Sequence, residues 1–474
     1  MIAAAKPSLS ISRGAAAQEP LARLMMRVAP ALMIALGFLA FTPYPAISIG
    51  RASAVQIGNV LSLFLLIPVL AMPWRYRPIY LYPLILAPLV LSAVKAGLTE
   101  TGDVDLCFKT ISAWVVAAAT MVVVQMYAPR YALHVLTGIA AATLVHTAVG
   151  LWQVYCFSQN QFPFLALYVN QSFLSVQDYA DVTARYVQRP FGVFPEPSAM
   201  ASSLAPWIVF WVAELCGIVR LRDQPARWQR VLFAAAAAGG LVLIILSSSG
   251  HQVITLAAVL LIGLLWFRDL RATRRTVMIV LPVLGVLLPL MLWMAATIMS
   301  SRVDGEYQAG GSWDDRSTSL LVGLSLYAHG DLPTLLFGLG VGLSSPLVSS
   351  TAGLDAVWSV LLTYLYETGL AGILVVGAIG FYLFRVWRAS ELNAAFAAMT
   401  VVWVVGITLT TSYHQLLPIW VALGWLTVWP AICTTAKPEP ARRHTLDLPR
   451  PQLLAAPDRR TWVSMAGSLK GADR

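Results

Sequence analysis

The sequence predicts an all-α integral membrane protein that crosses the membrane many times. Of its 474 residues, 58% are hydrophobic and only 11% are charged, which lies outside the usual range of soluble globular domains. Apolar runs of about 20 residues recur along the chain, and a helix needs a run of about this length to cross a hydrocarbon core. The runs are continuous rather than alternating, which favours helices over strands.

We expect about twelve transmembrane helices, cut wherever charges or prolines interrupt the apolar runs. Basic residues mark most boundaries in chain order, at Arg51, Arg75, Lys95, Arg130, Arg220, Arg268 and Arg385. The expected spans are 28–48, 54–73, 79–94, 109–128, 132–156, 199–219, 231–248, 251–267, 276–299, 357–384, 393–413 and 415–433. The span 357–384 is expected to break near Gly369. Residues 28–433 therefore form one transmembrane domain between tails 1–27 and 434–474.

The distribution of basic residues predicts that both termini are cytoplasmic. With this orientation, 25 of the 32 lysines and arginines lie in cytoplasmic segments and 7 lie outside, as the positive-inside rule requires. The net charge of +10 then reflects topology and attraction to anionic lipid, with no need for nucleic acid. The C-terminal tail is rich in Pro, Arg and Ala without helical periodicity, so we expect it to be disordered.

Two outside segments, 157–198 and 300–356, are much longer than the other connections. Long loops between packed elements are commonly functional or disordered. Both segments mix aromatic residues, charges and glycines, a composition that disordered linkers avoid. We therefore expect ordered, ligand-facing structure in them. The four cysteines are too few and too scattered for a zinc site, although pairing of Cys107 with Cys156 stays open.

Four motifs occur in one order along residues 185–385. They are RPFGVFPEPSAMA from Arg189, LSSSGHQVITLAAVLL ending at Leu261, the outside loop with DDRS and LLFGLGVG, and YLYETGLAGILVV from Tyr364. In this order the motifs resemble the bacterial O-antigen polymerase and ligase superfamily. The FPEPS sequence is similar to that of its exopolysaccharide polymerases.

The resemblance implies a metal-independent glycosyltransferase, without a cofactor, that works on the outer face of the bacterial inner membrane. The donor would be a glycan on an undecaprenyl diphosphate carrier, and the acceptor another lipid-linked repeat unit or, for a ligase, lipid A core. The ligases of the superfamily carry a His about nine positions before the Glu of the ETG element. Trp358 stands there in this chain, which favours a polymerase. Whether a chain-length regulator and export proteins are partners stays open.

Arginines suit the predicted chemistry, because cleavage of a sugar–diphosphate bond leaves negative charge on the departing diphosphate. The planar guanidinium binds phosphate oxygens bidentately and stays charged. Arg189, Arg302 and Arg316 lie in the two long outside segments, and His251 lies in an outside turn. We predict that these residues contact the diphosphate. Alternatively, Arg189 and Arg302 are interfacial anchors and Arg316 pairs locally with the preceding aspartates.

A carboxylate near the acceptor hydroxyl would take up its proton. Glu196 is the first candidate for this base, Asp315 the second and Asp355 the third. Glu196 lies just before a helix that is expected to begin near Ser198, so its alternative role is to complement the helix dipole. Pro195 and Pro197 fit either role, since they fix the backbone on both sides of the carboxylate.

Two further features have competing interpretations. The run Gly338, Gly340, Gly342 resembles the family's GxGxG and is otherwise a flexible turn. Glu367 lies within a predicted span, where an ionised side chain needs a partner. It could bind a polar group at the mouth of the active site, pair with a basic residue on another helix, or mark the helix break. His146 and Glu214 are expected to be packing residues.

A transporter or flippase of lipid-linked oligosaccharide is the main alternative from another functional class. Such a protein would also have twelve spans, but transporters place polar groups near the midplane of repeated halves. The unusual polar residues here collect in outside segments and no internal repeat is evident. The sequence therefore favours the transferase.

Overall fold

The computed structural model is mostly helical in the part of the chain that it describes. The described residues are 19–43, 46–47, 55–70, 81–98, 103–159, 161, 189–247, 249, 251–269, 312–353, 357–390, 394–409 and 414–435. The helices are α1 (Glu19–Ala40), α2 (Ile57–Leu70), α3 (Leu81–Leu98), α4 (Val104–Ser158), α6 (Pro197–Leu215), α7 (Arg227–Leu246), α8 (His251–Asp269), α10 (Ser312–Ala328), α11 (Leu332–Phe337), α12 (Ser344–Ala352), α13 (Val360–Ala389), α14 (Ala394–Leu409), α15 (Leu417–Thr427) and α16 (Trp429–Ile432). The all-α class predicted from the sequence is confirmed at this level.

Five of these helices are long and apolar enough to cross a membrane. They are α3, α4, α6, α7 and α13. Six shorter apolar helical segments of 10–17 residues also occur, five of them within expected spans. The sixth, at 317–328, lies in a segment expected to be an outside connection, and the span expected at 276–299 lies outside the described residues. The chain is therefore helical and membrane-compatible.

Helix α4 contains the break that was expected between 128 and 132. Two helices meet there at a kink, where the backbone of Tyr131 is non-helical, with φ −125° and ψ 28°. Pro129 lies two residues earlier. Proline removes one helix hydrogen bond and its ring crowds the preceding turn, which kinks a helix without requiring a loop. The predicted break is at the right place, but it is a kink.

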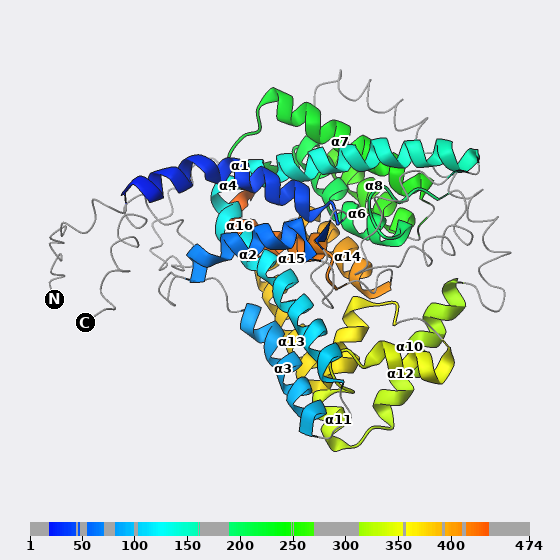
Figure 1. The fold of residues 1–474 in the computed structure, drawn as a ribbon. Coiled ribbons are helices and arrows are strands. Elements are labelled where there is room, and N and C mark those ends of the chain that lie inside the picture. Colours follow the sequence, from blue (N-terminus) through cyan, green and yellow to red (C-terminus); the bar gives the residue numbers. More distant parts are fainter. Residues whose placement is uncertain are drawn as a thin grey trace.

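Helices α1 and α4 cross at a pair of glycines. A Cβ atom at Gly138 would lie 2.1 Å from the carbonyl oxygen of Ile34, and one at Gly37 would lie 2.3 Å from that of Val135. The two backbones are thus in direct contact, the arrangement that small residues permit between membrane helices. Figure 1 shows α1 beside the second half of α4, which runs across the direction of the first half.

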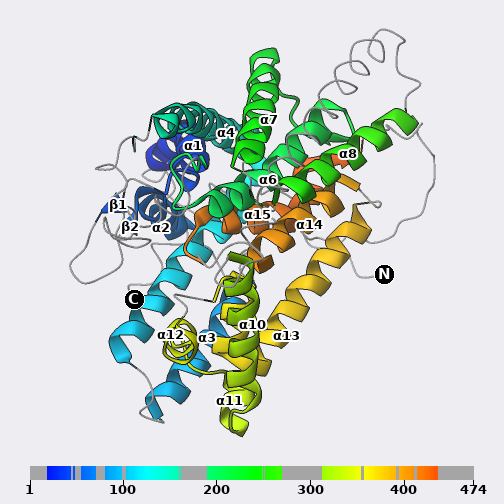
Figure 2. The ribbon, with the colours of Figure 1, turned by 90° about the vertical axis from the view of Figure 1, so that its right-hand side faces the viewer.

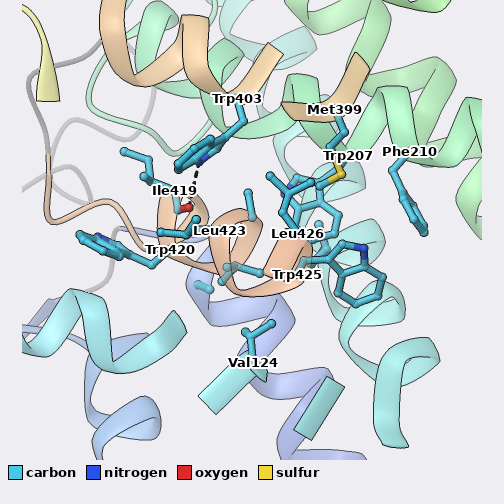
Figure 3. Packing of buried hydrophobic residues seen from close by; sticks show 14 of the residues in the cluster. Val124, Trp207, Phe210, Met399, Trp403, Ile419, Trp420, Leu423, Trp425 and Leu426 are labelled. Carbon is cyan, nitrogen blue, oxygen red and sulfur yellow. Dashed lines mark hydrogen bonds between the residues drawn. The ribbon is translucent and has the colours of Figure 1, made fainter. Parts of the chain in front are cut away.

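Helix α6 is the centre of the hydrophobic core. Of its 18-residue membrane-length window, 89% is buried, against 28% for α13. Trp207 and Phe210 of α6 pack edge-on against Trp425 of α15, with ring centroids 5.5 and 5.4 Å apart (Figure 3). On the other side of α15, the indole nitrogen of Trp403 donates to the carbonyl of Ile419 over 3.0 Å. These aromatic contacts connect α6, α14 and α15.

Two short antiparallel strand pairs complete the described chain. β1 (Ala46–Ile47) pairs with β2 (Val55–Gln56), and β3 (Val219–Leu221) pairs with β4 (Cys433–Thr435). The second pair joins the end of α6 to the end of α16. Thr434 and Thr435 belong to the tail that was expected to be disordered, so that expectation is wrong for these two residues. The four cysteines are free thiols, so Cys107 and Cys156 are not paired.

The helices within residues 300–356, the second segment expected to lie outside, gather at one end of the molecule. Figures 1 and 2 both show α11 beside the C-terminal end of α3, with α6, α7 and α8 at the opposite end. The C-terminal end of α10 adjoins α11, so its N-terminal end is the one that points toward α6 and α8 (Figure 2). Helix α10 therefore extends from one group of helices toward the other.

Candidate functional site

The first two motifs of the predicted site adjoin in the structure. The side chain of Arg189 is partly buried, and its Nε donates to the carbonyl oxygen of Ser247 over 2.8 Å. Ser247 is the C-cap of α7 and begins the segment that leads into α8. A cation at this position complements the negative end of the α7 dipole. The structure thus gives Arg189 a local anchoring contact, at a place where two motifs meet.

Gln153 of α4 holds the turn that follows Arg189. Its Oε1 accepts from the backbone nitrogens of Phe191 and Gly192 at 3.0 and 2.9 Å, while its Nε2 donates to the carbonyl of Gly192 over 2.8 Å. The side chain is fully buried. Gly192 has φ +60°, a conformation that side chains disfavour. One amide side chain therefore satisfies three buried backbone groups, and sequence reasoning did not identify it.

His146 fixes the next residue of the same turn. Its Nδ1 accepts from the backbone nitrogen of Val193 at 3.2 Å, and its Nε2 lies 2.5 Å from the carbonyl oxygen of Phe41. These two partners assign the neutral tautomer with hydrogen on Nε2. The ring is fully buried, and a Cβ atom at Gly192 would lie 2.8 Å from its Nδ1. The expectation that His146 is a packing residue with satisfied polar groups is confirmed.

Glu196 occupies the N-cap position of α6. Its backbone is extended, Pro197 is the first helical residue, and the carboxylate makes no capping bond to a backbone nitrogen. The carboxylate instead accepts from the hydroxyl of Ser198, and the residue is only 5% exposed. The carboxylate still lies at the positive end of the helix dipole. Glu196 is thus a buried carboxylate at a helix start, enclosed by protein.

The last two motifs also adjoin, at a break in α13. Gly369 has φ +62° and ψ −146° in the middle of this helix, so the break expected near this residue is confirmed. The backbone nitrogen of Leu339 donates to the carbonyl of Tyr366 over 2.8 Å. Gly338, Gly340 and Gly342 all have positive φ. The glycine run therefore packs its backbone directly against the broken turn, rather than forming only a flexible turn.

Glu367 is buried at this junction. It is 2% exposed, and its Oε1 accepts from the hydroxyl of Ser344 at 2.7 Å. The backbone N–H groups of Gly342 and Ser344 also face the carboxyl group. Its Oε2 makes no hydrogen bond. The structure shows Glu367 beside the helix break, bonded to a hydroxyl and facing the start of α12. Within the described chain no ion pair with it is seen.

Helix α3 supplies two polar side chains to the same junction. The hydroxyl of Ser92 donates to the backbone carbonyl of Glu367. Nζ of Lys95 donates to the hydroxyl of Thr334 at 3.1 Å and to the carbonyl of Gly338 at 3.2 Å. A break in a helix leaves carbonyls without their usual partners. Ser92 satisfies one of them, that of Glu367, whereas Lys95 bonds to the carbonyl at the end of α11. Neither Ser92 nor Lys95 was predicted, because only the folded structure brings α3 to the break in α13.

Asp331 caps the short helix α11 that leads into the glycine run. Its carboxylate accepts from the backbone nitrogen of Thr334 at 3.0 Å. Hydrogen bonds from the side chain and backbone of Thr334 lower the pKa of Asp331, and the charge of Lys95 acts in the same direction. The Asp331 carboxyl is exposed. It is therefore ionised at neutral pH and fixes the start of α11.

The other predicted site residues are placed only in part. Asp315 and Arg316 lie near the start of α10 and His251 is the first residue of α8, but the positions of their side chains are not described. Arg302 and Asp355 lie outside the described residues. The end of α10 that carries Asp315 and Arg316 is the one that points toward α6 and α8 (Figure 2).

The arrangement provides two buried carboxylates that accept from serine hydroxyls. It also provides two partly buried cations that donate to backbone carbonyls of distant segments. Within the described chain, no group of three His, Cys, Asp or Glu side chains could hold a metal ion. Comparison with protein-family models, curated proteins and solved structures gave no match in any of the three.

Proposed function

We propose that this protein is a polysaccharide polymerase of the exopolysaccharide or O-antigen type in the bacterial inner membrane. It transfers a glycan from an undecaprenyl diphosphate carrier to a lipid-linked repeat unit on the periplasmic face. The chain crosses the membrane about twelve times in this proposal, with both termini in the cytoplasm. The reaction needs cations for the departing diphosphate and a base for the acceptor hydroxyl.

One observation carries the proposal. The four motifs that resemble the polymerase and ligase superfamily are spread over the chain, yet they meet in two pairs. Arg189 bonds to Ser247 in the first pair, and Leu339 bonds to Tyr366 in the second. Helix α10 runs from the second pair toward the helices of the first (Figure 2).

In this reaction Arg189 would hold the diphosphate through its guanidinium, whose planar fork matches phosphate oxygens. Arg316, Arg302 and His251 remain further candidates for the same anion. Glu196 would accept the proton of the acceptor hydroxyl. Because Glu196 is buried and accepts from Ser198, the acceptor reaches it only if this segment opens on binding. Asp315 and Asp355 remain the alternative bases.

A transporter of lipid-linked oligosaccharide is the second candidate, and one observation favours it. Helix α13 is broken at Gly369 beside the buried Glu367, and discontinuous helices with polar groups are typical of transporter binding sites. Ligation to lipid A core is a third possibility within the same superfamily. Trp358, which stands where the ligases carry a His, argues against it.

The test is chain extension by purified protein. Wild type and Arg189→Lys would be mixed in detergent with undecaprenyl diphosphate-linked oligosaccharide and no nucleotide sugar, and product length read on a gel. Arg222→Lys is the matched control, because Arg222 also donates to a backbone carbonyl, that of Pro430 at 2.9 Å, but lies on the side predicted to be cytoplasmic. We expect a ladder from wild type and the control only, since lysine lacks the bidentate fork.

Two outcomes would contradict the proposal. Equal ladders from all three proteins would remove Arg189 from the site. No ladder from wild type, together with movement of the same lipid-linked oligosaccharide across the membrane of reconstituted vesicles, would assign the chain to the transporters.

A further inference from the structure

We propose that Glu367 is a positioning residue, which holds the helices of the second outside segment in their working arrangement on the broken turn of α13. The positioning role rests on the proposed function. The contact between Glu367 and α12 does not depend on that function. Glu367 and the broken turn contact α3, α10 and α12. Their effect on the reaction would be indirect, through α10 and α12.

Three residues of the broken turn each contact a different part of the segment. The hydroxyl of Tyr366 donates to the carbonyl of Leu320 in α10 over 2.9 Å. The carboxyl group of Glu367 accepts from Ser344, the first residue of α12. Gly369 lets the end of α11 approach, since a Cβ atom there would lie 2.6 Å from the nitrogen of Gly338. The broken turn thus contacts all three helices of the segment.

Glu367 is the residue of this turn whose contact is electrostatic. The start of α12 has backbone N–H groups without helical partners and the positive end of the helix dipole. Leu343, the N-cap residue of α12, supplies no side-chain capping bond. The Glu367 carboxyl group lies against the N–H groups of Gly342 and Ser344. Glu367 therefore caps α12 from another helix.

Contacts between helices connect α12 to the predicted site residues in α10. Helices α10 and α12 pack against each other and against α13. The glycine at 323 in α10 lies directly on the ring of Tyr366, where a Cβ atom would approach its Cε2 to 2.4 Å. The N-terminal end of α10 carries Asp315 and Arg316. Release of α12 would therefore change the placement of this end.

The buried environment makes the contact difficult to replace. Glu367 is 2% exposed and its Oε2 has no partner, so water cannot substitute for the lost carboxyl group without entering the junction. Glu214 in α6 provides a matched control. It is also a buried glutamate, 8% exposed, with an Oε2 that lacks a partner, but it lies at the far end of α6 from the outside segments.

Spin labels would measure the arrangement directly. The four native cysteines would be replaced by alanine and labels placed in pairs, Ser350→Cys with Leu374→Cys and Leu321→Cys with Leu374→Cys. Ser350, Leu321 and Leu374 are exposed. We expect both distance distributions to broaden in Glu367→Ala and to stay unchanged in Glu214→Ala. Unchanged distributions in Glu367→Ala would overturn the proposal.

Kinetics on lipid-linked oligosaccharide would test the positioning role. We expect Glu367→Ala to lower kcat for chain extension by about a hundredfold, because a misplaced site loses rate even when the mutation is remote, with little change in KM. Glu367→Gln, which keeps the acceptor for Ser344, should recover most of the rate. Normal kcat despite broadened distances would also overturn the proposal.

Two safeguards separate the possible failures. If Glu367→Ala is not recovered folded, Ser344→Ala replaces it in the experiment, because it removes only the hydroxyl partner. We expect it to broaden the same distance distributions to a smaller degree. Distance distributions as narrow as those of wild type would then refute the contact. If wild type itself does not extend chains, the proposed function fails, and the distance measurements alone decide whether Glu367 holds α12.

Discussion

Substitution of Gly369 by alanine tests the broken turn on which the second part of the site depends. The backbone at this position has φ +62° and ψ −146°, which costs a residue with a side chain about 1–3 kcal/mol. A Cβ atom would lie 2.6 Å from the nitrogen of Gly338 and 2.8 Å from the carbonyl oxygen of Leu335. Both neighbours are backbone atoms, so relief requires movement of the glycine run.

The expected loss of stability follows from these two contributions. Forcing an extra methyl into a filled site typically costs about 1–3 kcal/mol, and together with the backbone strain we expect about 4 kcal/mol. Gly377 in the same helix is the control, since a Cβ atom there would meet nothing within 4 Å. Gly377→Ala should be neutral or stabilising by up to about 1 kcal/mol, because alanine favours helix over glycine.

The assay is reversible unfolding in mixed detergent micelles, followed by the fluorescence of the 16 tryptophans. Gly369→Ala should shift the unfolding midpoint strongly toward lower denaturant, and Gly377→Ala should not. Equal, small shifts for the two variants would refute the reasoning, because they would mean that the turn at Gly369 either is not strained or does not contact the glycine run.

Three further predictions concern other contacts. Gly138→Val should weaken the crossing of α1 and α4 and lower the unfolding midpoint in the same assay, because its Cβ atom would lie 2.1 Å from a backbone oxygen; Gly97→Val, in open space, should have a much smaller effect. Gln153→Leu leaves three buried backbone groups unsatisfied, so it should lower the free energy of unfolding by about 2–5 kcal/mol and shorten the glycan ladder. A normal ladder would show that the turn keeps its shape without Gln153. The bonds to Thr334 lower the pKa of Asp331, so its contribution to stability is complete above its ordinary pKa and is lost as pH falls through the lowered one. Thermal midpoints should therefore fall more steeply with acid in wild type than in Asp331→Asn. Parallel curves would contradict the capping role.

Local sequence patterns predicted several features that the structure confirms. The helix break near Gly369 followed from a Glu-Thr-Gly run inside an apolar span, where glycine is the residue that tolerates positive φ. The start of α6 was expected near Ser198 and lies at Pro197, where proline fits the first helical position. The kink of α4 at Tyr131 lies in the break expected between 128 and 132, where Arg130 marked the boundary. Each of these signals depends on residues close together in the chain.

The contacts that complete the candidate site could not be predicted in this way. Gln153 and His146 lie in an apolar helix and hold a turn that follows some 40 residues later. Lys95 was assigned to a loop end, yet it bonds to Gly338. No periodicity connects such residues, because the pairing depends on which helices pack together. An isolated polar residue in an apolar helix indicates only that some partner exists.

The sequence by itself determined the class of the protein. Its excess of apolar residues and the length of its apolar runs specify helices that suit a membrane, because lipid leaves backbone groups no other partners than their own helix. Only the tertiary structure decided how the four motifs meet, which side chains satisfy the broken turn of α13 and that Glu196 and Glu367 are buried. These properties arise from contacts between segments far apart in the chain, and they depend on side-chain packing that local sequence does not encode.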